Sequence, residues 1–175
     1  ARSGARDFST IGDALAAATD RNGDGRITIE VGEGVYRESV RVARPVVVRG
    51  RGAGRTVIDA HGAGPALTLA ASGALTTGVT VTGGTVGVSV ETTGAVSDLD
   101  AWANVGDGVR LATTGAAVSD SVARANGGNG FALTAPGTVS GCQSLANTHA
   151  GISVQGVANA VVTDNQVAAN GGDGL

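Results

Sequence analysis

The sequence predicts an all-β fold, a right-handed, single-stranded parallel β-helix (a solenoid) with a short capping α-helix at its N-terminal end. Three observations predict it: a repeat of 21 to 23 residues, short strands that alternate apolar and polar residues, and a scarcity of large side chains. The 175 residues include 30 Gly but only two Phe, one Trp and one Tyr. A solenoid suits this composition because its narrow interior is filled coil by coil with small and branched apolar residues.

The repeat is clearest from residue 87 onward, where each coil opens with a glycine followed by an apolar residue. Three openings, Gly108–Leu111, Gly130–Leu133 and Gly151–Val154, continue as the start of a strand. Their period of two is typical of a strand with one buried face. The successive coils are Gly87–Asp107, Gly108–Asn129, Gly130–Ala150 and Gly151–Asp173, with lengths of 21, 22, 21 and 23 residues.

An asparagine preceded by an alanine recurs once in every regular coil. Because coils stack at about 4.8 Å, the four side chains are expected to form a ladder of amide hydrogen bonds. We interpret the ladder as structural, since asparagine tolerates left-handed backbone conformations in turns. Its members are Asn104, Asn126, Asn147 and Asn170.

One domain, residues 1–175, is predicted from the length and the continuous repeat. A helical cap occupies about residues 9–19, because the apolar residues of Thr10–Ala18 fall on one helical face. Irregular coils follow over about residues 27–86 and regular coils over residues 87–175. Together they predict six or seven coils.

The sequence stops at Leu175, two residues into a new coil. A bare last coil would expose strand edges and apolar side chains. Two interpretations follow. The chain is truncated and belongs to a longer solenoid, or its last coil stacks on another copy to form an end-to-end homo-oligomer.

Charge and hydropathy restrict the partners. The net charge of −3 argues against nucleic acid, whose binding proteins usually carry a basic face. No segment approaches the length of a membrane span, which argues against membrane insertion. Cys142 is the single cysteine, so the chain cannot form an internal disulfide.

The first candidate site is a calcium loop near the cap. Asp20, Asn22 and Asp24 match the oxygen ligands at the first, third and fifth positions of such a loop, with glycine at the sixth. The twelfth position is Val31 instead of a bidentate glutamate. Calcium therefore remains a candidate cofactor, while the mismatch favours a polar turn between the cap helix and the first strand.

A second candidate site follows from the stacking of coils. Asp98 and Asp120 occupy the same repeat position in consecutive coils, so we expect them about 5 Å apart. Two such carboxylates would bind a cation that relieves their repulsion. Trp102 lies one coil before Arg124 in the same column, and Asp100 lies on the same strand. The indole could stack on a sugar ring or under the guanidinium. The alternative is an exposed face of turn residues.

A resemblance to a known family rests on four sequence runs: DFSTI (7–11), DAL (13–15), GVYRE (34–38) and TVI (56–58). With them, residues 7–58 resemble the opening of pectin esterases and related pectin-lyase-like proteins. The later Asn-Gly repeats resemble carbohydrate-binding and sugar-hydrolase β-helices, a class that includes periplasmic copper-processing and alginate-epimerase relatives. The resemblance covers nearly the whole chain at the level of fold and implies an extracellular or cell-surface protein.

The same resemblance implies roles for the second candidate site. Pectate lyases hold calcium with carboxylates beside an arginine base, which makes Asp98, Asp120 and Arg124 the catalytic candidates. Trp102 and Asp100 are then the substrate-binding candidates. However, the Gln and Asp motifs of pectin esterases do not occur here, and neither do the motifs of polygalacturonases or alginate epimerases.

Two functions remain. In one, the solenoid binds or processes an acidic polysaccharide, as a lyase, esterase or epimerase relative without a recognisable catalytic set. In the other, it is a non-catalytic scaffold that self-associates end to end. Fold alone does not decide between them.

Overall fold

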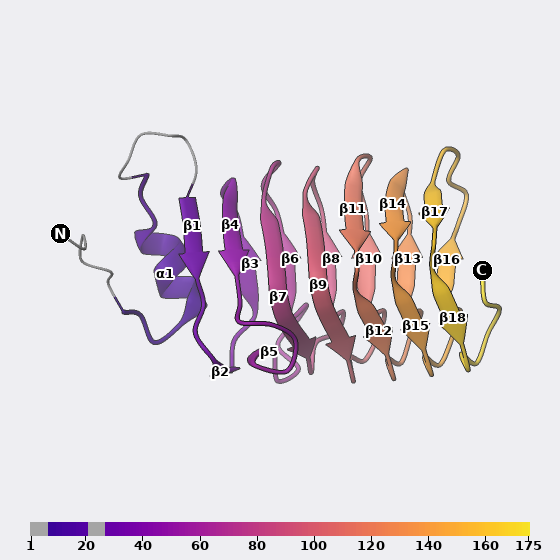
Figure 1. Cartoon of the computed structure of the whole chain (residues 1–175), viewed down its shortest axis with the longest axis horizontal. Coiled ribbons are helices and arrows are strands. Elements are labelled where there is room, and N and C mark those ends of the chain that lie inside the picture. The colour runs from indigo at the N-terminus through magenta and orange to yellow at the C-terminus, as the bar shows by residue number, and fades with distance from the viewer. Residues whose placement is uncertain (1–6, 21–26) are drawn as a thin grey trace.

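The computed structural model describes residues 7–20 and 27–175, which form a right-handed parallel β-solenoid of about six turns with one short helix at its N-terminal end. The predicted fold class is confirmed. Figure 1 shows the coils stacked along one axis, with α1 at one end and the C-terminus at the other. No helix in the described ranges is long and apolar enough to cross a membrane.

The helix is α1 (Ile11–Ala17), and the strands are β1 (Ile27–Glu30), β2 (Gly34–Tyr36), β3 (Val40–Val42), β4 (Val46–Arg49), β5 (Thr56–Asp59), β6 (Leu67–Leu69), β7 (Leu75–Thr82), β8 (Val88–Val90), β9 (Ala95–Trp102), β10 (Val109–Leu111), β11 (Ala116–Ser119), β12 (Val122–Arg124), β13 (Phe131–Leu133), β14 (Gly137–Ser140), β15 (Gln143–Leu145), β16 (Ile152–Val154), β17 (Val161–Thr163) and β18 (Gln166–Ala168).

These strands form two parallel sheets. The smaller sheet has the order β16-β13-β10-β8-β6-β3. The larger has twelve strands and two faces that meet at a corner: β1, β4, β7, β9, β11, β14 and β17 run along one face, and β2, β5, β12, β15 and β18 belong to the other, which the second halves of β7 and β9 also join. At the corner the backbone is left-handed, with φ of 48° at both Asp98 and Asp120 and 62° at Gly141. The corner explains why this column contains glycine and aspartate, residues that tolerate this conformation.

The register between coils follows the predicted repeat. Val109 pairs with Val88 on one side and with Phe131 on the other. Inward-facing Val, Ile and Leu side chains form one continuous core, and Phe131 is its largest fully buried member. A narrow interior filled this way needs few aromatic residues, as the composition indicated.

The asparagine ladder is present, and its interpretation as a structural element is confirmed. The Nδ2 atom of each asparagine donates to Oδ1 of the asparagine one coil further, at 2.9 Å for all three links between Asn104 and Asn170. One detail was wrong. The left-handed residue is not the asparagine but the alanine before it, with φ of 52° at Ala103 and 51° at Ala125. The left-handed alanine turns the chain, so that the asparagine side chain after it can bond the asparagine of the next coil.

Two side chains hold the N-terminal end of the cap helix. Thr10 is the N-cap, since its Oγ1 atom accepts a hydrogen bond from Asp13 N at 3.1 Å. Glu38 adds an unpredicted contact, since its carboxylate accepts from Ile11 N at 2.7 Å and from Gly12 N at 2.9 Å. The last residue of the GVYRE run thus binds the N-terminus of α1, which gives that motif a structural role.

The last coil leaves several apolar side chains exposed, among them Val161 at 47 %. End-to-end association through this coil stays a prediction.

Candidate functional site

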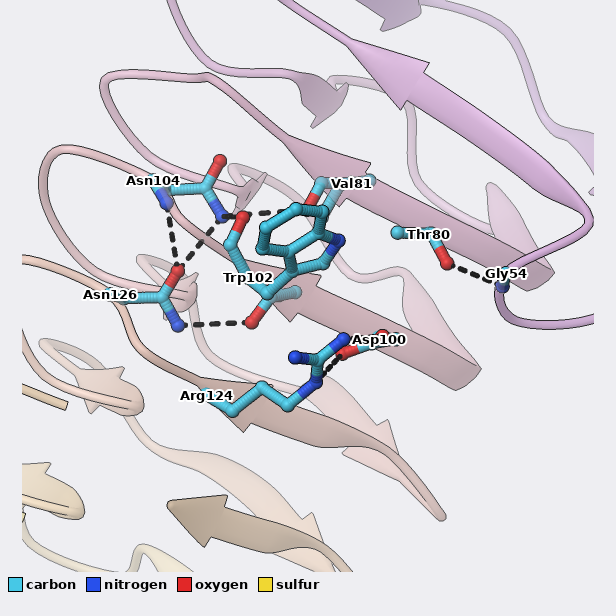
Figure 2. A network of polar contacts seen from close by, with 9 residues as sticks. Gly54, Thr80, Val81, Asp100, Trp102, Asn104, Arg124 and Asn126 are labelled. Carbon is cyan, nitrogen blue, oxygen red and sulfur yellow. Dashed lines mark hydrogen bonds and ion pairs between the residues drawn. The ribbon is translucent and has the colours of Figure 1, made fainter. Parts of the chain in front are cut away.

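Arg124, Trp102 and Asp100 come together on the outer face of the larger sheet. The register pairs Arg124 of β12 with Trp102 of β9, as the repeat predicted. The guanidinium donates from Nε to Asp100 Oδ1 at 3.0 Å and from Nη2 to Asp100 Oδ2 at 2.8 Å. Its Cζ lies over the indole, 5.3 Å from the ring centroid. The three side chains therefore form one cluster, an ion pair beside an aromatic ring, which Figure 2 shows from close by.

The ladder below this surface fixes the backbone that carries it. Asn104 Nδ2 donates to the carbonyl of Trp102 at 3.3 Å, and Asn126 Nδ2 donates to the carbonyl of Ala101 at 3.0 Å. Both amides are buried, so these bonds are shielded from water. These bonds hold the end of β9, from which Trp102 projects, and Asn147 Nδ2 likewise donates to the carbonyl of Ala123 in β12 at 2.9 Å.

Asp98 and Asp120 lie at the corner beside this surface. The register places them at equivalent positions, and both are exposed. A Cβ added to Gly141 would come within 2.9 Å of Asp120 Oδ1, so the carboxylate lies against the glycine of the next coil. Within the described residues, the Arg124 guanidinium donates to Asp100 and not to these two carboxylates.

Two glutamines extend the surface along the solenoid axis, and sequence reasoning missed them. Gln143 of β15 pairs in register with Gln166 of β18, and both side chains are exposed. They continue the column that contains Asp100 and Val122. The repeat contained the signal, because each glutamine follows the corner residue of its coil by two positions, as Asp100 follows Asp98.

The candidate calcium loop is described only in part. Asp20 lies within the described residues, whereas Asn22 and Asp24 lie outside them. Across residues 7–20 and 27–175, no group of three or more His, Cys, Asp or Glu side chains is arranged to hold a metal ion. Calcium binding at the loop therefore remains a prediction.

The comparison with protein families identifies the chain. Residues 19–175 match the family described as periplasmic copper-binding protein (NosD). The chain belongs to the NosD family. Among solved structures, this NosD-family chain resembles an alginate lyase from Paenibacillus sp. str. FPU-7, with a TM-score of 0.69 and 16 % sequence identity. The match covers 88 % of this chain and 62 % of the lyase, so the chain spans less than two thirds of that enzyme. No curated protein sequence matches significantly.

The donor set of this NosD-family chain does not fit a copper centre within the described residues. Copper selects imidazole and sulfur ligands, and the chain has two His, one Cys and no Met. His61 follows β5 and His149 follows β15. Four strand spacings, about 19 Å along the solenoid axis, therefore separate the two histidines. Cys142 is buried inside the coil. These residues do not converge on one ion.

Proposed function

We propose that this chain binds an acidic polysaccharide outside the cytoplasm, along the outer face of β9, β12, β15 and β18. The observation that carries the proposal is the Arg124 guanidinium fixed between Asp100 and the Trp102 ring. The periplasmic family and the fold likeness to a polysaccharide lyase support the location and the class of ligand.

Each side chain on this face suits one part of an acidic sugar chain. Trp102 is 37 % exposed, which leaves part of its indole for the apolar face of a sugar ring. The Arg124 side chain is 44 % exposed and offers its outer N–H groups to a carboxylate, a geometry that guanidinium binds well. Gln143 and Gln166 offer amide donors and acceptors to hydroxyl groups.

The geometry favours binding over cleavage. Asp100 accepts two hydrogen bonds from Arg124, which orients the guanidinium for recognition of an anion. The alternative remains a calcium-assisted lyase that uses Asp98, Asp120 and Arg124, and the shared column of the two aspartates favours it. In that case Asp120→Ala abolishes calcium-dependent cleavage of polygalacturonate, measured by the absorbance of the unsaturated product. An unchanged rate discards that site.

The binding experiment uses Trp102 as its own probe, because it is the single tryptophan of the chain. Titration with polygalacturonate is expected to change the tryptophan fluorescence, and neutral dextran is expected to leave it unchanged. Arg124→Gln should weaken the affinity at least about tenfold, the size of one charge-assisted hydrogen bond. Arg49→Gln is the matched control, since Arg49 forms an exposed ion pair with Glu30 elsewhere on the same sheet.

Two results would overturn the proposal: no fluorescence change with any acidic glycan, or an equal loss of affinity in the Arg124 and Arg49 variants. The second result would mean that general charge, and not this surface, attracts the polymer.

A further inference from the structure

A separate trough lies on the outer face of the six-stranded sheet. It has a volume of about 310 Å³ and extends over β10, β13 and β16. Asp107 and Asn129 form one wall, and Thr134 and Gln155 belong to the turns that follow β13 and β16. The volume lies at the lower end of the range for small-molecule sites.

The repeat creates this hollow. Arg110, Ala132 and Ser153 occupy one outward column on three consecutive strands. On the two strands next to Arg110, the side chains in this column are short. They leave a depression in the surface beside the guanidinium. The trough therefore has a cation at one end and a floor of small side chains.

Asp107 fixes the guanidinium at the end of the trough. Its Oδ2 atom accepts from Arg110 Nε at 3.1 Å and from Nη2 at 2.8 Å. Its Oδ1 atom accepts from both the backbone N and Nδ2 of Asn129, each at 2.9 Å. Four N–H donors thus surround one carboxylate whose side chain is only 10 % exposed. The Arg110 side chain remains 43 % exposed, and its Nη1 atom donates no hydrogen bond to the described part of the chain.

We propose that this trough is a second glycan site, which takes one carboxylate-bearing sugar unit. The Nη1 edge of Arg110 donates to the sugar carboxylate, while Thr134 and Gln155 contact its hydroxyl groups. Asp107 is a positioning residue that holds the guanidinium in place. The choice of ligand class rests on the proposed function, but the site lies on a different sheet and uses none of the residues around Trp102.

The probe is trigalacturonate, with its methyl ester as the uncharged control, and binding is measured by titration calorimetry. The experiment uses the Arg124→Gln background, which removes the proposed polymer face. Binding of the acid is expected to persist there. It is expected to fall at least tenfold when either Arg110→Gln or Ala132→Leu is added. The leucine fills the floor without changing any charge.

Arg41→Gln is the control variant. Arg41 lies on β3 of the same sheet, outside the trough, and forms an exposed ion pair with Glu91. It should leave the affinity unchanged. Circular dichroism of each variant verifies the fold, and shifts of the side-chain amide signals of Asn129 and Gln155 in NMR spectra locate the ligand.

The outcomes separate the two proposals. If trigalacturonate binds in the Arg124→Gln background and loses affinity with Arg110→Gln, the trough is a site, whatever the tryptophan fluorescence shows. If the acid does not bind in that background, or if Ala132→Leu and Arg110→Gln both bind as well as their parent, the trough is not a glycan site. The second result leaves the Trp102 surface to be judged by its own titration.

Discussion

Glu38 and Arg44 bind opposite ends of the same helix. The Glu38 carboxylate accepts from the backbone N–H groups of Ile11 and Gly12, and Arg44 Nη1 donates to the carbonyl of Ala18 at 2.6 Å. The two charges complement the helix dipole, which is positive at the N-terminus and negative at the C-terminus. A helix of seven residues is unstable alone, so α1 depends on these contacts and on the burial of Ile11 and Leu15.

The first prediction concerns this attachment. Glu38→Ala should lower the free energy of unfolding by about 1 kcal/mol, the usual cost of losing a helix N-terminal acceptor, as measured by urea denaturation. Glu33→Ala is the control, because Glu33 forms only an exposed ion pair with Arg55 and its loss should cost little. Equal effects of the two substitutions would contradict the role of Glu38.

The second prediction concerns the middle of the asparagine ladder. Asn126→Ala leaves the buried N–H of Asn104 and the carbonyl of Ala101 without their partners. Each unsatisfied buried group costs about 1 to 3 kcal/mol, so we expect a loss of about 3 kcal/mol or more in urea denaturation. Asn170→Ala, at the less buried end of the ladder, should cost clearly less. A ladder that contributes nothing would show no difference between the two positions.

The third prediction is that glycine at position 125 makes the chain at least as stable as alanine does, the reverse of the usual order. Ala125 has φ of 51°, a conformation that costs an L-residue about 1 to 2 kcal/mol and glycine very little. Even after the added chain entropy of glycine, about 0.5 to 1 kcal/mol, Ala125→Gly should leave stability unchanged or raise it. Ala117→Gly, within strand β11, should lower stability by about 0.5 to 1 kcal/mol. Thermal melting of both variants tests the reversal, and a clear loss at position 125 would refute it.

The fourth prediction concerns pH and Cys142. Burial raises the pKa of this thiol above its ordinary value of 9.0, and Asp120 adds to the rise. Below pH 9 the thiol is neutral in both the folded and the unfolded chain, so its contribution to stability is fully present. As the pH rises above 9, the unfolded chain ionises first and stability falls.

Urea midpoints at pH 7 and pH 10 measure this fall, and Cys142→Ala should reduce it. A thiol reagent should modify Cys142 slowly at pH 8 in the folded chain and rapidly in urea. Fast modification of the folded chain would show that the thiol is not protected.

Contacts between equivalent positions of successive coils could be predicted from the sequence. Arg124 stacks beside Trp102, and the four asparagines form one ladder, because a repeat of fixed length in sequence becomes a fixed register in space. The same logic applied to Gln143 and Gln166 would have extended the surface, but their side chains differ from the aspartate that begins the column.

Other contacts could not be predicted because they depend on side-chain direction. Stacking alone suggested that Asp98 and Asp120 form a pair near Arg124, whereas the guanidinium binds Asp100. The left-handed corner turns the Asp98 backbone away from the regular strand pattern, so alternation cannot indicate which carboxylate faces the arginine.

The class of fold, the coil length, the ladder and the columns could all be predicted, because they follow from periodicity along the chain. Which charges pair, and where the surface is hollow, could be read only from the folded molecule. Glu38 binds α1 from 26 residues beyond Gly12, and the trough exists because Arg110 is followed across the coils by Ala132. The Glu38 contact joins residues that share no repeat position, and only the packing of one coil on the next shows that the column of Arg110 leaves a hollow.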